Sequence, residues 1–572
     1  MGKKIVVVGG VAAGPKAAAR VKRLLPDADV TLVDQDSLIS YGGCGIPYYV
    51  SGDVADENAL RSTSYHMLRD ADFFARAKGV TVFTGTRATA IDRQAKTARV
   101  FDLATKAERD LPYDALVLAT GSEPIPLPIA GLDLDGVYAI SDLHQAIAIK
   151  DRIAKGLVSR AVVIGGGAIG IEMAEAFTDL WGIETALVEF REQLLPGIIS
   201  ASLASMLHKH LADNKVAVYC GEGAQAIIGE QGKVVAVRTA KRELPADLVI
   251  CAAGVRPRSQ LARQCGLEIG ARGGIVVNER MQTSDPNIYA AGDCVEIRHL
   301  VSGKKFVAPF GSLANKEGRV VADNIAGIPS SFPGSVGAFI MKAFSCCVGG
   351  LGLSLETARA EGFDADCSYT APSDRAHFYP EQKVFCLELT FDRRSRRVLG
   401  VHGFGAANDA LMARIDAASM AISQGASIDD FANLELPYAP PFATAIDALN
   451  AAAHAADNLC DGRMTQITPR EFLDWVANGA LHPDWLVADI RHPKDAAKAV
   501  ERFGPGRWQA IPYDQARARY NEFPRDKTLI LLCNSGTRTY ESQLVLRAQG
   551  FEKTLVVGGG SNFLSRMGAD WL

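Results

Sequence analysis

Short apolar runs alternate with amphipathic segments over about the first 330 residues. Runs rich in β-branched residues, such as Ile5–Val8 and Ala161–Ile164, are typical of buried parallel strands. The segments after them have the apolar spacing of helices. This alternation predicts α/β units built on parallel sheets.

The pattern changes between about 335 and 455. Strand-like segments such as Phe385–Phe391 occur here, and a helix is predicted around 408–424. This region reads as an α+β domain. An alanine-rich stretch, Ala451–Ala456, then leads to Gly462 and to a small α/β unit that begins at about 464.

Size and composition limit the class of protein. A chain of 572 residues is too long to fold around a single hydrophobic core, so roughly three to four domains are expected. With 48% hydrophobic and 22% charged residues the chain is typical of globular proteins. The net charge of -4 gives no reason to expect a nucleic-acid partner, and no basic run with interleaved aromatic residues occurs.

No apolar run approaches the roughly 20 residues that a membrane-spanning helix needs. The 11 cysteines are scattered without paired spacing, which is typical of a reducing compartment. We therefore predict a cytoplasmic protein without a membrane partner.

Two predicted strands lead into glycine-rich turns that open helices. The turns are GGVAAG at 9–14 and GGGAIG at 165–170, and the second has the full GxGxxG spacing. Such turns let the backbone approach a pyrophosphate at a helix N-terminus. The residues predicted to hold dinucleotides in these turns are Gly9, Gly10, Ala12, Ala13, Gly14, Gly165, Gly167 and Gly170.

An acid ends the second strand of each unit. These acids are Asp34 and Glu189, at the distance where a carboxylate accepts hydrogen bonds from a ribose. A carboxylate at Glu189 repels a 2′-phosphate, so NADH is favoured over NADPH, although Arg191 nearby weakens that preference. The same fold is predicted to occur twice.

Two further apolar strands end in tight turns, at Thr120-Gly121 and at Gly292-Asp293. With these turns the sequence resembles the pyridine nucleotide-disulfide oxidoreductases. The resemblance implies that the first fold binds FAD and the second binds the nicotinamide dinucleotide. It also implies that Asp293 contacts the ribityl or phosphate portion of FAD, and it assigns Gly254 to the cofactor site.

Cys44 lies between two glycines in SYGGCGIPYY, residues 40–49. A glycine-rich turn is a poor place for a core residue, and a thiolate can attack sulfur. No CxxC partner accompanies it, so a disulfide formed in turnover is expected to involve a small molecule. The alternative, an inert buried thiol, is common for cysteines in general.

The segment around Cys44 resembles the single-cysteine active site of the coenzyme A-disulfide reductase branch. The resemblance implies a mixed disulfide between Cys44 and coenzyme A. It implies that Tyr379 and Tyr438, from a dimerisation domain, lie near the substrate thiol of the partner subunit and donate a proton or hydrogen bond. The substrate contacts that it implies in this part of the chain are Arg20, Arg23, Ser40, Lys78 and Asn315.

Two weaker interpretations stay open for parts of this pattern. Arg20 and Arg23 are three residues apart and share one helix face, which is equally typical of a solvated surface. The sister branch of NADH peroxidases and oxidases also uses one cysteine, but it characteristically has a histidine where this chain has Ala12. The peroxidase interpretation is therefore disfavoured.

Cys533 follows the apolar strand 528–532 and precedes a polar loop, with a helix predicted from about Tyr540. A loop wrapped around the sulfur aims backbone N–H groups at it, and Arg538 adds positive charge. Such a site stabilises a thiolate or a persulfide. The alternative is a cysteine that merely ends a buried strand.

The last domain resembles a rhodanese. The Cys533 loop, the segment Val487-Ala488-Asp489-Ile490-Arg491 and the glycines 558–560 carry this resemblance. It implies sulfur transfer through Cys533. The pair Cys346-Cys347 is expected to be two small buried hydrophobes, and no zinc site is predicted because His402 and the other histidines lack ligand partners.

We predict an α/β protein with two Rossmann-like dinucleotide-binding domains, an α+β dimerisation domain and a C-terminal rhodanese-like α/β domain. The expected domains are FAD-binding at 1–150 and 246–332, NAD-binding at 151–245, dimerisation at 333–456 and rhodanese at 464–572.

The predicted function is a homodimeric flavoprotein reductase that uses FAD, NADH and coenzyme A. It reduces persulfide or polysulfide through Cys44, with sulfane sulfur delivered by Cys533. A coenzyme A-disulfide reductase with an accessory sulfurtransferase domain is the first alternative. A flavin-bound sulfur sensor or carrier is the second.

Overall fold

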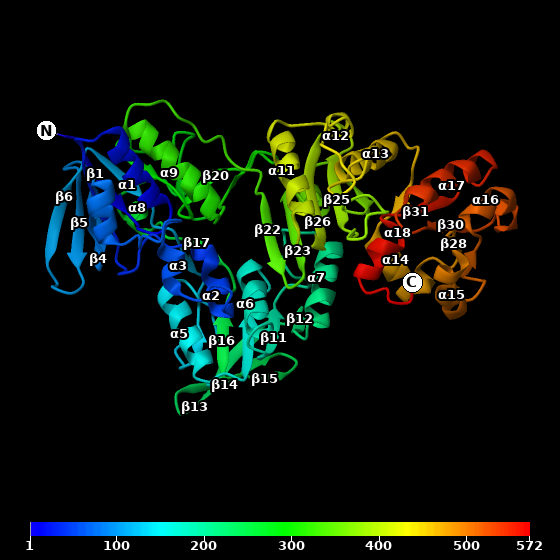
Figure 1. Ribbon diagram of the computed structural model, residues 1–572, viewed down its shortest axis with the longest axis horizontal. Coiled ribbons are helices and arrows are strands. Elements are labelled where there is room, and N and C mark those ends of the chain that lie inside the picture. The colour runs from blue at the N-terminus through cyan, green and yellow to red at the C-terminus, as the bar shows by residue number, and fades with distance from the viewer. Residues whose placement is uncertain (1) are drawn as a thin grey trace. The chain divides into compact units, whose positions relative to one another are not determined.

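The computed structural model describes residues 2–572, which divide into two compact units (Figure 1). One unit is formed by residues 2–190 with Glu222–Ser335 and the other by Arg191–Gly221 with Val336–Leu572.

The first unit begins with a parallel sheet of strand order β19-β7-β1-β2-β3. Its strands are β1 (Lys4–Val8), β2 (Asp29–Val33), β3 (Thr81–Phe83), β7 (Ala115–Leu118) and β19 (Ile288–Ala290). Val8 pairs with Val33 and with Leu118, and Leu118 also pairs with Ala290. This register aligns the carboxyl ends of four strands, so the loops that follow them lie at one edge of the sheet.

Two helices cover this sheet, α1 (Ala13–Leu24) and α9 (Gly311–Ile325), and they pack against each other (Figure 1). The strands β1 and β7 are buried almost throughout, which explains why they read as unbroken apolar runs. α1 instead has a buried alanine stripe and a polar face that carries its lysines and arginines.

A second parallel sheet in the first unit places β10 (Arg160–Ile164) between β11 (Glu184–Glu189) and β16 (Leu248–Cys251), with β9 (Val137–Tyr138) beyond β16. Ile164 pairs with both Val188 and Cys251, so the loops after these strands also share one edge. The helix after β10 is α6 (Ala168–Thr178), and α2 (Ile46–Ser51) packs against it. The alternation read from the sequence is confirmed for both sheets.

The first unit also contains smaller antiparallel pieces. They are the sheet of β4 (Thr86–Asp92), β5 (Thr97–Asp102) and β6 (Glu108–Pro112), the sheet of β13 (Ala224–Glu230), β14 (Lys233–Thr239) and β15 (Glu243–Pro245), and the pair of β8 (Ser122–Pro124) and β17 (Val255–Pro257).

The second unit contains an antiparallel sheet of order β22-β23-β26-β25-β24. Its strands are β22 (Phe339–Ala343), β23 (Cys346–Gly352), β24 (Ala365–Thr370), β25 (Cys386–Asp392) and β26 (Val398–Ala406). α7 (Ala201–Asp213), α11 (Asp409–Ser423) and α13 (Ala448–Cys460) pack on it. The strand predicted at 385–391 and the helix predicted at 408–424 are both confirmed.

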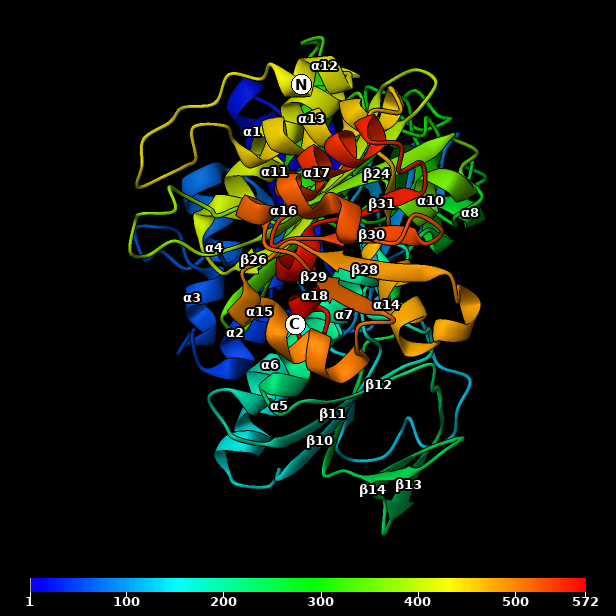
Figure 2. The ribbon, with the colours of Figure 1, turned by 90° about the vertical axis from the view of Figure 1, so that its right-hand side faces the viewer.

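The C-terminal part of the second unit is a parallel sheet of order β27-β31-β30-β28-β29. Its strands are β27 (Gln466–Ile467), β28 (Trp485–Asp489), β29 (Trp508–Ala510), β30 (Thr528–Leu532) and β31 (Thr554–Val557). Figure 2 shows α16 (Tyr513–Arg519) and α17 (Thr537–Ala548) on one side of it, with α14 (Pro469–Ala477) and α18 (Gly560–Arg566) on the other. This is the separate α/β unit expected after about residue 464.

A buried ion pair lies within that C-terminal sheet. Asp489 and Arg491 are fully or almost fully buried, and the Arg491 guanidinium donates to both Asp489 oxygens, with distances down to 2.7 Å. The Trp508 indole N–H also donates to Asp489 at 3.0 Å. Because the carboxylate is fully satisfied, the pair fixes the end of β28 against β29.

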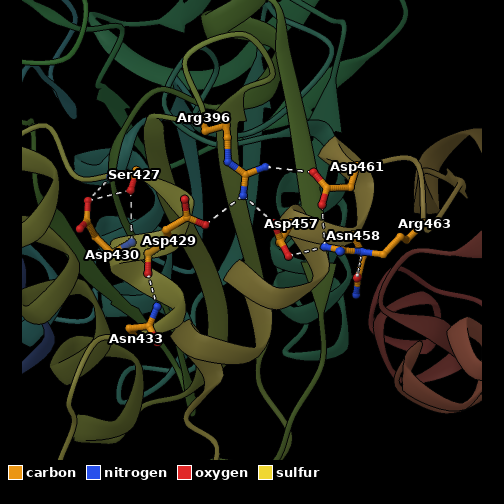
Figure 3. A network of polar contacts seen from close by, with 9 residues as sticks. All are labelled: Arg396, Ser427, Asp429, Asp430, Asn433, Asp457, Asn458, Asp461 and Arg463. Atoms are coloured by element: carbon orange, nitrogen blue, oxygen red, sulfur yellow. Dashed lines mark hydrogen bonds and ion pairs between the residues drawn. The ribbon is translucent and has the colours of Figure 1, made fainter.

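A network of charges joins the antiparallel sheet to the start of the C-terminal part (Figure 3). Arg396, on the turn after β25, forms ion pairs with Asp429 at 3.0 Å, Asp457 at 2.5 Å and Asp461 at 3.3 Å. Arg463 also forms ion pairs with Asp457 and Asp461. Arg396 therefore ties together α12 (Ile428–Ala432), α13 and the segment that leads to β27.

None of the helices in residues 2–572 combines the length and the apolar character that crossing a bilayer requires.

The Arg396 network generates a prediction on stability. Arg396→Gln removes one charge that serves three carboxylates, and we expect the free energy of unfolding to fall by about 1–2 kcal/mol. The matched control is Arg394→Gln, since Arg394 is 85% exposed and has one partner at 3.3 Å. That change is expected to stay within about 0.5 kcal/mol.

Chemical denaturation in urea at low and high salt measures both variants. The deficit of Arg396→Gln is expected to shrink in 1 M NaCl because salt screens the half-exposed pairs. Equal losses in the two variants would contradict the role assigned to Arg396.

Candidate active site

The first glycine loop lies at the end of β1, next to the end of β2. The Gly10 N–H donates to Asp34 Oδ2 at 2.5 Å, and the Asp36 N–H donates to Asp34 Oδ1 at 2.8 Å. Burial raises the pKa of the Asp34 carboxyl, while these two backbone N–H groups oppose that rise. Ala12 and Ala13 begin α1 directly after the loop, so its N-terminus opens beside the carboxylate.

The second loop repeats this arrangement at the end of β10. The Gly166 N–H donates to Glu189 Oε2 at 2.6 Å, and Glu189 is buried. A Cβ atom at Gly170 would lie 2.0 Å from the Gly165 carbonyl oxygen, so α6 approaches the strand end as closely as glycine allows. A Cβ at Gly167 would meet no atom within 4 Å. Gly167, at the N-cap of α6, therefore borders open space.

Two more turns meet at the edge of the first sheet. The Ser122 hydroxyl, just after Gly121, donates to Asp293 Oδ2 at 3.0 Å. Burial raises the pKa of the Asp293 carboxyl, and the Ser122 hydrogen bond opposes this. The Thr120 hydroxyl donates to the Arg258 carbonyl at 2.6 Å. The predicted Thr120-Gly121 and Gly292-Asp293 positions therefore lie together, as the shared strand register requires.

Gly254, the other predicted cofactor residue of the first unit, contacts Ile125, which follows β8. Gly254 has a φ of +100°, and its carbonyl accepts from the Ile125 N–H at 3.0 Å. A Cβ there would meet the end of the Ile125 side chain at 3.5 Å. The residue thus connects the segment after β16 to the segment after β8.

Cys44 occupies a single 3₁₀ turn, Gly43–Gly45, and its thiol is exposed. α2 follows at once, with Pro47 in its first turn. A Cβ atom at Gly311, the first residue of α9, would lie 3.8 Å from the Cys44 sulfur. The sulfur therefore lies next to the first residue of a 15-residue helix, where unpaired N–H groups and the helix dipole favour negative charge.

Sequence reasoning missed two polar side chains of the helices packed near this cysteine. Burial raises the pKa of the Tyr48 hydroxyl to about 12, with smaller effects from neighbours that include Glu172 and Cys44. Burial also raises the pKa of the Glu172 carboxyl to about 7, and Glu175 raises it further. One signal was available, because Glu172 is an acid two residues after the last glycine of the second loop.

The basic residues predicted to contact coenzyme A in the first unit differ in exposure and in the groups that they contact. The Arg20 guanidinium pairs with the buried Asp323 of α9 at 2.6 Å, whereas Arg23 is exposed. The Lys78 ammonium lies 5.1 Å from the centre of the Phe73 ring. Because Arg20 already has a carboxylate partner, any anion that it binds must share it.

Ser40 and Asn315 are tied to the two segments that frame the cysteine. The Ser40 N–H donates to the Gly10 carbonyl at 2.7 Å, and Ser40 has a left-handed φ of 53°. The exposed Asn315 donates to the Gly311 carbonyl at 2.9 Å. The structure therefore places Ser40 by the first loop and Asn315 one turn into α9.

The two predicted tyrosines of the second unit lie on adjoining loops. The Ala376 N–H donates to the Pro440 carbonyl at 3.1 Å, which joins the loop of Tyr379 to the loop of Tyr438. Tyr438 is 50% exposed. Its loop ends at Asp447, whose carboxylate forms a buried ion pair with Arg414 at 2.5 Å.

Cys533 lies buried at the end of β30 in the second unit. The Gly536 N–H donates to its sulfur at 3.1 Å, and the Thr539 hydroxyl lies 3.6 Å away. Arg538 donates to the Asn534 side chain. The Thr539 hydroxyl itself donates to the Gly536 carbonyl at 2.6 Å, so the Gly536 N–H is the one donor that the structure shows of the predicted ring of several N–H groups.

The helix after Cys533 starts earlier than predicted. α17 begins at Thr537 rather than near Tyr540, because Gly536 takes a left-handed conformation with φ 92° and serves as its N-cap. The polar residues 534–536 suggested a longer loop, but three of the residues assigned to it form the first helical turn. The shorter loop brings the N-terminus of α17 directly beside the sulfur.

Cys346 and Cys347 are both buried in β23, as expected for two small hydrophobes. Cys347 donates to the Ala406 carbonyl at 3.1 Å. Across residues 2–572, no disulfide joins the 11 cysteines, and no group of three or more metal-ligating side chains could hold an ion.

Two glycine loops, each with its acid, and a cysteine beside the first loop define a two-dinucleotide oxidoreductase fold. Residues 3–308 match the pyridine nucleotide-disulphide oxidoreductase family, and residues 340–449 match its dimerisation domain. The chain belongs to the pyridine nucleotide-disulphide oxidoreductase family.

Three relatives show how far the similarity extends. The chain is 35% identical over 449 residues to an NAD(P)H coenzyme A polysulfide/persulfide reductase of Pyrococcus horikoshii. This aligned region covers 78% of this chain and 97% of the relative. A structure of an NAD-dependent persulfide reductase from A. fulgidus matches with TM-score 0.92 and 38% identity, over 98% of this chain and 99% of the other. Reduced Bacillus anthracis CoADR-RHD matches with TM-score 0.90 and 30% identity, over 99% of this chain and 98% of the other.

The two glycines of the second loop generate a matched pair of predictions. Gly170→Ala forces a Cβ against the Gly165 carbonyl, and we expect a loss of roughly 1–3 kcal/mol in the free energy of unfolding. Gly167→Ala meets no neighbour, so stability is expected to stay within about 0.5 kcal/mol while the dissociation constant for NADH rises about tenfold.

Thermal unfolding and NADH titration by fluorescence measure the two effects separately. Unchanged NADH affinity in a folded Gly167→Ala variant would contradict the assignment of this loop to the pyrophosphate.

Proposed function

We propose that this chain is an FAD-dependent reductase that uses NADH to reduce a coenzyme A persulfide, or a related polysulfide, through Cys44. The observation that carries the proposal is the position of the exposed Cys44 thiol at the N-terminus of α9, in the unit that also contains both glycine loops. The names of the Pyrococcus and A. fulgidus relatives support persulfide or polysulfide as the substrate class.

The residues present fit the two dinucleotides. Asp34 and Glu189 stand where ribose hydroxyls would donate, and the N-termini of α1 and α6 open toward a diphosphate. We assign FAD to the first loop with Asp293, and NADH to the second. When bound, FAD supplies the two-electron transfer from NADH to a disulfide at Cys44.

The proposed reaction begins with the Cys44 thiolate. It attacks the inner sulfur of the persulfide CoA–S–SH, forms a Cys44–S–S–CoA bond and releases hydrosulfide. Two electrons and one proton then return the Cys44 thiolate and free coenzyme A thiol. The sum is CoA–SSH plus NADH and a proton, giving CoA–SH, H₂S and NAD⁺, which balances in atoms and electrons.

We assign the protein groups around this reaction as follows. Arg20, Arg23 and Lys78 offer positive charge to the coenzyme A phosphates, and Ser40 and Asn315 lie on the segments next to the thiol. Tyr379 and Tyr438 would donate a proton or hydrogen bond to the departing sulfur from the partner subunit of a homodimer. The match of residues 340–449 to a dimerisation domain supports that homodimer.

The role proposed for the C-terminal part is sulfur delivery by a rhodanese-like domain. The Cys533 thiolate attacks the outer sulfane sulfur of thiosulfate or of a polysulfide, the donor's sulfur–sulfur bond breaks, and sulfite or the shortened polysulfide leaves. The Gly536 N–H and the N-terminus of α17 stabilise the persulfide formed at Cys533. Transfer to the coenzyme A thiolate would then generate the substrate of Cys44. Arg538, in the first turn of the helix, is assigned to an anionic sulfur donor.

Two alternatives keep specific support. Reduced CoADR-RHD, similar over nearly the whole chain, favours a coenzyme A-disulfide reductase, and comparing turnover of the disulfide with that of the persulfide separates the two. A flavin-bound sulfur sensor or carrier would consume NADH slowly with every sulfur substrate.

The cytoplasm stays the predicted compartment, in keeping with 11 cysteines of which none is bridged in residues 2–572.

The first prediction here concerns the cysteine beside α9. In Cys44→Ser, NADH-linked H₂S release from coenzyme A persulfide is expected to fall about a thousandfold, because the nucleophile is lost. FAD content and thermal stability are expected to match the wild type, since the thiol is exposed. Retention of more than a tenth of the wild-type rate would refute the assignment.

The second concerns the buried thiol of the C-terminal part. Cys533→Ser is expected to abolish thiosulfate-dependent or polysulfide-dependent H₂S release while leaving turnover of preformed coenzyme A persulfide within about twofold. Cys460→Ser, at a partly exposed thiol on α13, is the control and should change neither rate. Equal loss on both substrates in Cys533→Ser would contradict the division of labour.

A further inference from the structure

Glu317 is a buried carboxylate that the function proposed above does not use. It lies on α9 and is 2% exposed. Its Oε2 accepts from the Gly292 N–H at 2.6 Å. Burial raises the pKa of this carboxyl to about 7, the Gly292 N–H opposes the rise, and the neighbouring Asp293 adds to it.

The side chain is in the wall of the predicted FAD site. A Cβ at Gly292 would lie 3.3 Å from the Ala13 Cβ and 3.6 Å from the Ala314 Cβ, and a Cβ at Gly318 would lie 2.6 Å from the Ala13 carbonyl oxygen. The start of α1, the Gly292 turn and this part of α9 therefore converge around Glu317.

The charged groups near Glu317 offer no compensating cation within residues 2–572. From the turn after β19, the Asp293 carboxylate and the Cys294 thiol interact with it. From α1, Arg20 pairs with Asp323, which lies further along α9, and Arg319 also pairs with Asp323 at 3.8 Å. The acid is thus next to another acid and beside the expected position of a diphosphate.

We propose that Glu317 holds a proton in the FAD-bound protein, so that FAD binding takes up a proton at this residue and weakens as the pH rises. A diphosphate brings two more negative charges toward Asp293 and Glu317 in a poorly solvated region, where like charges repel strongly. A neutral Glu317 removes one of those charges and still accepts from the Gly292 N–H. The inference rests on the assignment of FAD to the first loop.

The direction of the pH effect follows from linkage. Below pH 7 Glu317 is already protonated in the free protein, so FAD affinity is constant with respect to this group. Above pH 7 the free protein must gain a proton to bind FAD, so the dissociation constant rises, approaching tenfold per pH unit for one proton. The rise ends where the bound form itself loses the proton.

The test uses the full-length chain stripped of flavin and titrated with FAD by fluorescence between pH 6 and 9. Between pH 7.5 and 8.5 the wild-type dissociation constant is expected to rise at least threefold more than that of Glu317→Gln. Glutamine keeps the shape and the acceptor for the Gly292 N–H but cannot titrate. Glu268→Gln, at an exposed acid of the same unit, is the matched control and should follow the wild type.

A second readout counts the proton directly. Calorimetric FAD titrations at pH 7.5, in two buffers of different ionisation enthalpy, give the number of protons taken up. The wild type is expected to take up about half a proton or more beyond Glu317→Gln. Should that variant not fold, no proton uptake by the wild type at pH 7.5 would by itself overturn the inference.

The outcomes separate this inference from the proposed function. Parallel pH profiles and equal proton counts in wild type and Glu317→Gln would overturn the role of Glu317 and leave the FAD assignment standing. Failure of the wild-type chain to bind FAD at any pH would instead overturn the proposed function, and this inference with it.

Discussion

The close approach of the Cys44 thiol to the first residue of α9 is the contact on which the account of this molecule depends. It brings a thiol from the segment after β2 to the positive end of a helix that begins more than 250 residues later. The contact is possible because α1 and α9 pack together on one sheet, and because Gly311 leaves room for the sulfur. An electrostatic environment for a thiolate thus follows from the packing of two helices.

The same packing sets the remaining charges of the first unit. Asp34 and Asp293 are half-buried and Glu317 is buried, and burial raises the pKa of all three carboxyls, while backbone N–H groups of glycine turns oppose that rise at Asp34 and at Glu317. At Asp293 the Ser122 hydroxyl opposes the rise instead. The proposed function assigns this edge of the sheet to a dinucleotide, with backbone N–H groups for the phosphates and carboxylates for the sugars.

Much of this arrangement could be predicted because it depends on local patterns. Strand–glycine–helix–strand–acid is written in sequence order, so both Rossmann loops and their acids Asp34 and Glu189 were found with their positions. The contacts that could not be found join distant segments. Nothing near residue 44 indicates that Gly311 will lie next to it, and Glu317 reads as one more polar residue of an amphipathic helix.

Two other differences have similar causes. Arg20 and Arg23 look equivalent on a helical wheel, yet only Arg20 meets Asp323 of α9 in the structure. The start of α17 was placed too late, because a glycine cap ends the loop sooner than its polar residues suggest. Local periodicity fixes the faces of helices, while the partner that each charge meets is decided by tertiary packing.

The central claim is that one sulfur near the amino end exchanges bonds with coenzyme A sulfur. The most direct test is the intact mass of the full chain after treatment with coenzyme A persulfide, followed by peptide mapping and then by addition of NADH. The account predicts one coenzyme A adduct, located at Cys44, that NADH removes. An unmodified Cys44, or an adduct elsewhere that NADH leaves in place, would contradict it.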